Sequence, residues 1–336
     1  MIWRAAMIDQ RLRRILMFLT LSVLTACAAR SPAPHAKPGY PIITNGSFSL
    51  PSGVRLPYRD WQPAGAPRAV VLALHGFNDS RDAWVTLGPV LARHGILVVA
   101  PDQRGFGAAP DRGHWPGTAT LLGEARQMIA LLHRRYPGVK LTLMGESMGA
   151  AEALMIGAAG DRAVASYVLI SPAVWGGQAM RAPLRWAAAL GGAVAPDLRL
   201  TGHQAHILAT DNIAALIRLS NDPLTIRATR LASVAGIVRL MGRAQTLCRA
   251  FAPAHALVMA GGHDQLIPKS AQARCWRAMP RDPGVVRAFY PADYHLMVLD
   301  HQRAVPIGDI LAFIRHPERP IPSSAPTEAE IFMAEH

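Results

Sequence analysis

The sequence is short of cysteine and of acidic side chains, and it holds no long run of like charge. Its 336 residues include three cysteines, none in a Cys-x-x-Cys pair and none spaced as zinc ligands, so we predict no metal site. Lysine and arginine total 35 against 22 acidic residues, which gives a net charge of +13. The basic residues are scattered and no nucleic-acid-reading module is present, so we predict no nucleic-acid partner.

The first residues are typical of an export signal rather than of a fold. Arginines precede an apolar stretch over residues 15–26 that is too short to span a bilayer, and small and proline-rich residues follow it. The tetrapeptide that ends in Cys27 resembles a bacterial lipobox, in which cleavage leaves a lipidated cysteine as the first residue. The resemblance implies a signal peptide over 1–26, a flexible tether over 27–46, and anchoring in the outer membrane facing the periplasm. Ordinary cleavage with release into the periplasm is the alternative.

Cys248 and Cys275 are the remaining cysteines of the chain. An exported protein meets an oxidising compartment, so these two residues could form a disulfide. Two buried, unpaired thiols are equally compatible with the sequence. Their state therefore stays open.

Six apolar runs alternate with helical patterns along the body of the chain. The runs begin at Ala69, Ile96, Lys140, Ser166, Ala256 and Val286. Continuous apolar runs are typical of parallel strands covered on both faces, and amphipathic segments such as residues 119–136 supply the helices. This alternation predicts a mostly parallel, doubly wound α/β sheet. A hairpin turning at residues 51–53 should add antiparallel strands at its N-terminal edge.

One serine stands between two glycines at the end of an apolar run. Residues 144–150 read MGESMGA, with a predicted strand before Ser147 and a helical pattern after it. Such a Gly-x-Ser-x-Gly turn raises the serine on a sharp strand-to-helix elbow, and its glycines allow the close approach of neighbouring backbone. The helix N-terminus behind it favours developing negative charge. We therefore predict that Ser147 is an attacking nucleophile.

A nucleophilic serine needs a base, and the base needs an orienting carboxylate. Asp264 and His295 follow the last two predicted strands, where open α/β sheets keep their sites. We predict that His295 takes the serine proton and that Asp264 orients its ring. Nearby candidates are weaker: His263 would point away from its neighbour, Asp293 and Asp300 are typical of solvated or capping carboxylates, and His301 opens a helical pattern.

Backbone donors are needed for the oxyanion that forms during attack on a carbonyl. One should be the N–H of Met148, directly after the nucleophile. The other should come from the loop after the first parallel strand, where we assign the N–H of Phe77. The Phe77 ring could also form a wall of the substrate site, or it could be an ordinary core side chain.

Five ordered motifs identify the chain as similar to a known superfamily. These are HGFNDS, PDQRGFG, GESMGA, GGHDQLIP and DYH, spread from His75 to His295. Together they resemble the α/β-hydrolase superfamily, and within it the monoacylglycerol lipase and lysophospholipase-like serine hydrolases, whose triad has the order Ser, Asp, His. The resemblance implies the α/β-hydrolase fold and no metal or organic cofactor. Relatives usually place a serine where Ala108 stands, a departure that touches a structural loop rather than the triad.

Residues 172–251 interrupt the strand-helix alternation and read as several helices. By resemblance they form a helical cap inserted after the predicted strand that begins at Ser166, which is the sixth strand when the two hairpin strands are counted. The cap divides the body into residues 47–171 and 252–317. A cap covers the serine with apolar walls and sorts substrates by chain fit. The predicted wall residues are Trp175, Trp186 and Leu190, although all three could simply pack the cap. Residues 318–336 turn proline-rich and then acidic, which predicts a mobile tail.

The cap carries nine arginines and three aspartates, and it has no lysine or glutamate. Arginines favour phosphate and anionic membrane surfaces, and a solvated surface would explain them equally well. The pattern therefore favours lysophospholipid over a neutral glyceride only slightly.

The functional prediction is a membrane-tethered serine esterase that cleaves a lipid ester through an acyl-Ser147 intermediate. The substrate would be a monoacylglycerol, a lysophospholipid or a similar apolar ester. Acyl transfer to another alcohol, or general carboxylesterase activity, would use the same residues. A non-catalytic lipid-binding lipoprotein should lack a member of the triad, and none is missing. No obligate protein partner is evident.

Overall fold

A computed structural model describes residues 42–44, 46–201 and 207–336. The chain divides into two units, 1–38 and 39–336, and the described residues fall within the second. Cys27, the signal peptide and most of the tether predicted from the sequence lie outside the described residues. Within the described ranges, no helix is long and apolar enough to cross a membrane.

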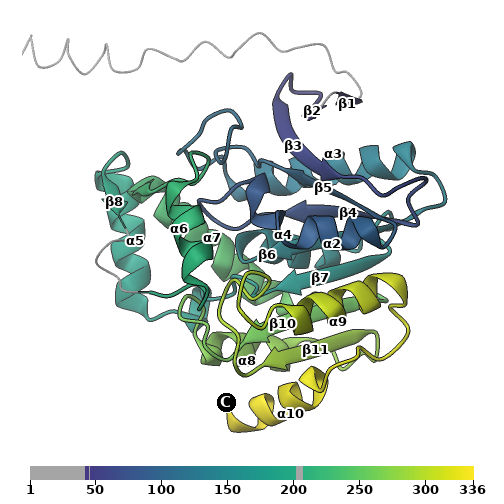
Figure 1. The fold of residues 1–336 in the computed structure, drawn as a ribbon. Helices are drawn as coiled ribbons and strands as arrows, with labels where there is room; N and C mark the ends of the chain where they lie inside the picture. The colour runs from purple at the N-terminus through teal and green to yellow at the C-terminus, as the bar shows by residue number, and fades with distance from the viewer. Residues whose placement is uncertain (1–41, 45, 202–206) are drawn as a thin grey trace, which may run out of the picture. The chain divides into compact units, whose positions relative to one another are not determined.

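A nine-stranded sheet forms the centre of the body (Figure 1). Its spatial order is β1-β2-β3-β5-β4-β6-β7-β10-β11, in which the first three strands are antiparallel and the strands from β5 to β11 run parallel. The bounds are β1 Ile42–Thr44, β2 Ser47–Ser49, β3 Arg55–Trp61, β4 Ala69–Leu74, β5 Ile96–Pro101, β6 Lys140–Glu146, β7 Ser166–Ile170, β10 Ala256–Gly261 and β11 Val285–Tyr290.

The predicted α/β-hydrolase fold is confirmed strand by strand. All six apolar runs form parallel strands, and every residue of β4, β5, β7 and β10 is buried. Helices on both faces exclude water from these strands, which is why their side chains do not alternate between apolar and polar. The hairpin at residues 51–53 joins β2 to β3, and β3 pairs antiparallel with β5.

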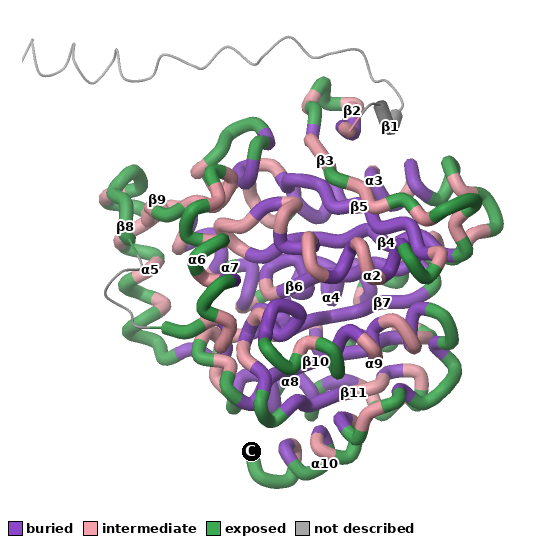
Figure 2. The backbone as a smooth tube through the Cα atoms, viewed as in Figure 1, coloured by how far each residue is buried: buried purple, intermediate pink, exposed green. Residues whose placement is uncertain are grey.

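Helices cover both faces of the sheet (Figure 2). One apolar cluster joins the sheet to α3 (Thr118–Arg135), α4 (Met148–Ala158) and α8 (Lys269–Ala278). The other joins it to η1 (Arg81–Trp84), α2 (Leu87–Arg93) and α9 (Ala304–Arg315). The apolar positions predicted for α3 are buried, so its amphipathic stripe faces the sheet.

The cap inserted after β7 combines helices with a small ribbon. It contains η2 (Gly177–Ala179), α5 (Ala182–Val194), β8 (Arg199–Thr201), α6 (Ile213–Asn221), β9 (Ala228–Arg230), α7 (Leu231–Leu247) and η4 (Cys248–Ala250). β8 and β9 form an antiparallel pair that the sequence did not reveal. Leu240 and Ala244 of α7 are fully buried in the apolar cluster that contains α4, so this helix joins the cap to the core.

The chain end differs from the mobile tail predicted for residues 318–336. It contains helix α10 (Ala325–Glu335), which packs against β11. The Phe332 ring is 2% exposed and stacks on Phe289 at 4.3 Å between centroids. The edge of the Trp276 ring contacts it as well. Burial of Phe332, with Ala325 and Ala329, contributes to offsetting the entropy of ordering this terminal helix, and the polar composition of the segment concealed it.

The question left open for the two body cysteines is settled by a disulfide. Cys248 in η4 is bonded to Cys275 in α8. The bond joins the end of the cap to the helix that follows the Asp264 loop. It therefore fixes the place where the chain returns from the cap to the core.

Candidate active site

Ser147 lies at the junction of β6 and α4 with a strained backbone. Its φ of 53° lies in the left-handed region, which side chains other than glycine rarely adopt. A Cβ on Gly149 would lie 2.2 Å from the carbonyl oxygen of Leu74, and a Cβ on Gly145 would lie 2.2 Å from the carbonyl carbon of Gly149. Only glycine fits at both positions, so the strand, the turn and the helix can approach closely.

Asp264 and His295 are in direct contact. His295 Nδ1 lies 2.8 Å from Asp264 Oδ2, and the two side chains are 3% and 2% exposed. The other carboxylate oxygen accepts backbone hydrogen bonds from Leu266 (2.8 Å) and Ile267 (2.9 Å). These bonds fix the carboxylate, so it accepts the proton of Nδ1 and leaves Nε2 free to act. Nε2 is buried and has no hydrogen-bond partner within the described ranges.

Backbone bonds bring the His295 loop to the sheet edge that carries Ser147. The Ser147 N–H donates to the carbonyl of Ile170 (2.9 Å), and the Ser171 N–H donates to that of Met259 (2.9 Å). Ser171 Oγ donates to the carbonyl of His295 (2.8 Å). The sequence analysis missed this role of Ser171, although a serine at the end of the neighbouring buried strand was a signal for it.

The weaker candidates have other roles. His263 stacks on the ring of Tyr294, with 5.3 Å between centroids. Asp300 accepts a hydrogen bond from the Tyr294 N–H at 2.7 Å, and His301 is exposed, with its N–H donating to Asp211. Among the described residues, none of these side chains forms a hydrogen bond or ion pair with the His295 ring. Asp264 is therefore the carboxylate that orients the ring.

The loop after β4 lies against Ser147. A Cβ on Gly76 would meet the Ser147 Cβ at 3.4 Å. His75 fixes this loop from below: its Nε2 accepts from the Gln103 N–H (3.0 Å), so the proton is on Nδ1, which donates to the Gly76 carbonyl (2.8 Å). Burial lowers the pKa of His75 and keeps this ring neutral. Phe77 follows, packed beside the rings of Phe106 and Trp115.

The departure at Ala108 leaves its loop intact. Its backbone N–H donates to Asp102 Oδ2 (2.7 Å), a bond that requires no side chain at position 108. Asp102 also accepts from the backbone and guanidinium of Arg81 (2.8 and 2.6 Å). The loop is thus held by the aspartate rather than by a side chain at position 108.

Two carboxyl groups near Ser147 have raised pKa values. Burial raises the pKa of Glu146, the residue before Ser147, well above its usual range, and nearby Asp79 and Asp300 raise it further. Burial likewise raises the pKa of Asp79 to about 7. The raised pKa favours the uncharged form of Glu146, which reduces the repulsion of an oxyanion at the elbow. Within the described residues, no group of three potential ligands is arranged to hold a metal ion.

The cap is hydrogen-bonded to the loops that carry Asp264 and His295. The Leu296 N–H donates to the Ala209 carbonyl (2.8 Å), and the Leu208 N–H donates to the side chain of Gln265 (3.0 Å). Residues 208–209 thus bridge the His295 and Asp264 loops. This bridge ties the cap directly to the loops of Asp264 and His295.

The three residues predicted for an apolar wall lie in different surroundings. Trp175 is half-buried and packs against the core. Trp186 and Leu190 instead lie on an outward face of α5, 73% and 66% exposed. α5 buries none of its residues, so these two side chains do not form a closed wall over the serine.

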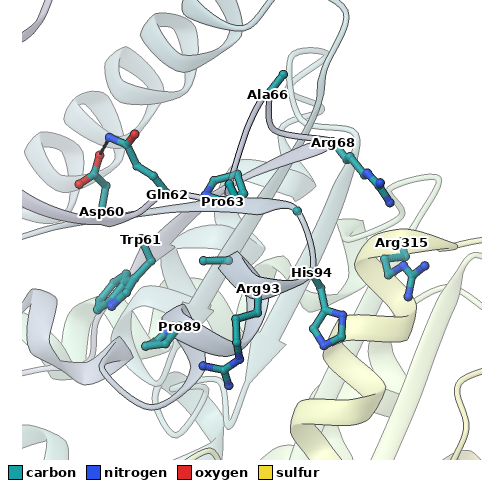
Figure 3. A pocket seen from close by; sticks show the side chains of 13 residues that line it. Asp60, Trp61, Gln62, Pro63, Ala66, Arg68, Pro89, Arg93, His94 and Arg315 are labelled. Carbon is teal, nitrogen blue, oxygen red and sulfur yellow. Dashed lines mark hydrogen bonds between the residues drawn. The ribbon is translucent and has the colours of Figure 1, made fainter.

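A large cleft lies at the opposite end of the sheet. It has a volume of about 890 Å³ and is lined by the end of β3, the end of α2 and Arg315 of α9. Figure 3 shows Trp61, Pro63, Pro89, Arg93 and His94 among the residues that line it. These residues precede or flank the N-terminal ends of β4 and β5, so this cleft is not the site of Ser147.

Comparisons with known proteins agree with this geometry. Residues 65–302 match the Hydrolase_4 family, described as serine aminopeptidase, S33. A monoacylglycerol lipase of Mycolicibacterium smegmatis is 25% identical over 270 residues, covering 80% of this chain and 95% of that protein. The human monoglyceride lipase is 28% identical over 172 residues, covering 51% of this chain and 56% of that protein.

Solved structures share the fold. The monoacylglycerol lipase of Paleococcus ferrophilus superposes with a TM-score of 0.66 at 19% identity, covering 77% of this chain and 98% of that one. A soluble variant of the Saccharomyces cerevisiae monoglyceride lipase also has a TM-score of 0.66 at 19% identity, covering 80% and 93%. With the sheet order, the strained serine elbow and the family match together, the chain belongs to the Hydrolase_4 family of α/β-hydrolases.

Proposed function

We propose that the protein is a serine hydrolase that cleaves the carboxylic ester of a single-chain lipid through an acyl-Ser147 intermediate. The observation that carries the proposal is the bond between His295 and Asp264 at the sheet edge of the strained serine. Monoacylglycerol lipase relatives support ester hydrolysis as the class of reaction. Monoacylglycerol is accordingly the first substrate candidate.

The triad residues divide the chemistry. Ser147 Oγ attacks the ester carbonyl while its proton passes to His295 Nε2, and Asp264 stabilises the imidazolium that forms. His295 then gives this proton to the leaving alcohol as the acyl carbon–oxygen bond breaks. Water repeats the sequence on the acyl-enzyme, with its proton passing to Nε2 and then to Ser147 Oγ, and a fatty acid is released.

Backbone donors would hold the negative charge of each tetrahedral intermediate. The N–H groups of Phe77 and Met148 flank the nucleophile, the first on the loop against Ser147 and the second at the first position of α4. The first N–H groups of a helix have no partner within it, so that of Met148 is available to an oxyanion. Loss of one such donor typically costs about 3 kcal/mol of transition-state stabilisation.

An apolar face on the outside of the cap supports work at a lipid surface. Trp186, Leu190 and Val194 are spaced four residues apart, so they share one side of α5. The exposed fractions of the large apolar side chains on this helix run from 48% for Leu184 to 74% for Val194. Contiguous exposed apolar side chains mark interaction surfaces, and a membrane is the natural partner of a lipid hydrolase.

Export and anchoring through a lipidated Cys27 complete the proposal. The disulfide between Cys248 and Cys275 supports an oxidising compartment, because reducing cytosol keeps most thiols unpaired. An outer-membrane location facing the periplasm agrees with both features. Incorporation of labelled palmitate into the wild type, and its loss in Cys27→Ala, would test this part alone.

Lysophospholipid is the second substrate candidate, favoured by a specific feature of the cap. Four arginines line one hollow beside the loop that carries Phe77. Arginine binds phosphate through paired N–H groups, which a neutral glyceride would not use. The hydrolytic residues would be the same for either substrate.

A fluorophosphonate probe tests the proposed nucleophile. We expect the wild type to be labelled at Ser147 and to hydrolyse monoacylglycerol, and Ser147→Ala to lose both properties while keeping its unfolding midpoint. Ser270→Ala, an exposed serine on α8, is the matched control and should match the wild type. A wild-type protein that hydrolyses no ester, or one labelled equally after Ser147→Ala, would refute the proposal.

A further inference from the structure

A hollow of about 540 Å³ lies at the edge of the cap. We call it the arginine hollow after four of its lining residues, Arg112, Arg199, Arg227 and Arg230. Asp222 is the carboxylate that lines it, and its Oδ1 already accepts a hydrogen bond from the Leu224 N–H (2.8 Å). Three of the nine cap arginines thus line the hollow, together with Arg112 from the core.

Two of the four arginines face each other directly. Arg199 on β8 is the cross-strand partner of Arg230 on β9, and like charges in such positions repel. Arg230 forms an ion pair with Asp197, yet its Nε is buried without a hydrogen-bond partner in the described part of the chain. Arg199 pairs with no carboxylate among the described residues. An anion bound by the two guanidinium groups would accept a hydrogen bond from Arg230 Nε and offset the repulsion between Arg199 and Arg230.

The arginine hollow is joined to the loop beside the nucleophile. The Ile226 N–H donates to the carbonyl of Asn78 (2.9 Å), and Asn78 Nδ2 donates to Thr229 Oγ1 (2.6 Å). Arg227 and Arg230 are the next residues along the chain from these two contacts, and Asn78 is the next residue after the proposed oxyanion donor. Neighbouring Cα atoms are about 3.8 Å apart. The residues that line the hollow are therefore only a few Cα steps from the proposed oxyanion donor Phe77.

Arg112 holds the wall of the hollow from the core side. Its guanidinium donates to the carbonyl oxygens of Pro223 (2.7 Å) and Thr225 (3.1 Å). These bonds fix the segment before Arg227. Both come from the same terminal nitrogen of Arg112. Arg199 and Arg227, both exposed, are therefore the side chains with the most freedom to close on a ligand.

We propose that the arginine hollow binds the phosphate of a single-chain lipid ester whose acyl ester bond lies at Ser147. The inference rests on the proposed function and deepens it, because it makes a lysophospholipid with an uncovered anionic phosphate the preferred substrate. The planar guanidinium forks match phosphate oxygens in paired hydrogen bonds, and the neutral hydroxyls of a monoacylglycerol offer no such charge. Arg199 and Arg227 are the specificity-determining residues.

A comparison of two substrates with the same acyl chain tests the proposal. We expect the wild type to have a higher kcat/KM for acyl-glycerol phosphate than for monoacylglycerol. The double variant Arg199→Gln/Arg227→Gln should lower kcat/KM for the phosphate ester about ten- to a hundredfold and leave that for monoacylglycerol within twofold. The matched control Arg218→Gln/Arg243→Gln removes two cap arginines outside the hollow and should leave the ratio unchanged.

A binding measurement keeps this inference separate from the proposed activity. Titration of Ser147→Ala with a non-hydrolysable ether analogue of acyl-glycerol phosphate should give an affinity that falls at least tenfold when Arg199→Gln and Arg227→Gln are added. Glycerol phosphate without an acyl chain should compete only weakly if the chain contributes to binding. Equal affinity in the two proteins, or parallel loss of kcat/KM for both substrates, would overturn the proposal. A wild type that hydrolyses neither ester but binds the analogue through these arginines would refute the activity alone.

Discussion

The core and the cap use their apolar side chains in opposite ways. α4 buries every residue from Met148 to Gly157, whereas α5, of similar length, buries none. In the core, close packing fixes the serine elbow and the loops of the acid and base. In the cap, apolar and cationic groups face outward, where a second molecule can meet them. Under the proposed function, the core would determine the reaction and the cap would determine what reaches it.

The largest effect should come from the carboxylate that orients His295. Asp264→Asn leaves the shape of the side chain but favours the wrong imidazole tautomer, so we expect kcat to fall by about three to four orders of magnitude. Steady-state hydrolysis of a p-nitrophenyl ester measures it. Asp293→Asn, two residues from the base and without a hydrogen bond or ion pair to its ring among the described residues, is the control. An equal loss in both variants would contradict the assignment.

Close packing in the core predicts a large loss of stability for Gly149→Ala. The added Cβ would meet the Leu74 carbonyl oxygen at 2.2 Å, so backbone must shift, and we expect the free energy of unfolding to fall by about 3 kcal/mol. Urea denaturation measures the change. Gly123→Ala in α3 has open space around it and should be neutral or slightly stabilising. Equal stability of the two variants would refute the packing argument.

The disulfide that joins cap and core should contribute a smaller amount. Cys248→Ala/Cys275→Ala removes a crosslink across a sequence separation of 27, and we expect a loss of about 2–4 kcal/mol in the free energy of unfolding. Dithiothreitol should lower the urea midpoint of the wild type and leave that of the double variant unchanged. A wild type insensitive to the reductant after unfolding and refolding would contradict this prediction.

The buried carboxyl of Asp79 predicts a pH dependence of stability. Its pKa is raised from 3.8 to about 7, so the folded state holds this proton more tightly than the unfolded state. Its contribution to stability is fully present below pH 3.8 and is lost as the pH rises toward about 7. The free energy of unfolding of Asp79→Asn should therefore match that of the wild type near pH 4 and exceed it by about 1–2 kcal/mol at pH 8. This is less than the full free energy that corresponds to the pKa shift.

Urea midpoints measured from pH 4 to 8 check the Asp79 prediction. Part of the pH dependence should remain in Asp79→Asn, because burial raises the pKa of Asp293 to about 7 as well. Asp111→Asn, at an exposed turn, is the matched control and should follow the wild-type profile. A parallel profile for Asp79→Asn would contradict the prediction.

The smallest effect on stability should come from the apolar face of the cap. Trp186→Ser/Leu190→Ser should change the free energy of unfolding by less than about 0.5 kcal/mol, because both side chains are exposed. Activity on substrate in vesicles should fall roughly tenfold as lipid contact is lost, while that on a soluble short-chain ester stays constant. Val305→Ser/Ile331→Ser replaces two exposed apolar residues outside the cap, and it should change neither the stability nor the activity on vesicles. Unchanged vesicle activity in the cap variant would refute the membrane role.

The core was predictable from sequence because its signals are local. Buried parallel strands leave continuous apolar runs, and the elbow needs glycines on both sides of Ser147. Asp264 and His295 could be assigned because each directly follows such a strand. The contact between them then required only that the strands be neighbours in the sheet, as β10 and β11 are.

The cap and the chain end were harder to predict because an apolar stripe does not say what it faces. Trp186 and Leu190 have helical spacing that fits a pocket wall as well as an outward surface, and only the packing of α5 decides between them. Phe332 is a single aromatic in a polar tail, and its burial depends on Phe289, more than forty residues away in the chain. The opposed Arg199 and Arg230 depend on strand register, which composition does not reveal.

The central claim is that acyl transfer takes place on Ser147, and trapping of the acyl-enzyme tests it most directly. The protein is mixed with p-nitrophenyl butyrate, quenched in acid during the first turnover, and digested for mass spectrometry. We predict one butyryl group on the peptide that contains Ser147, formed with a burst of one nitrophenol per protein molecule. A burst with the acyl group on another residue, or steady turnover by Ser147→Ala, would contradict the claim.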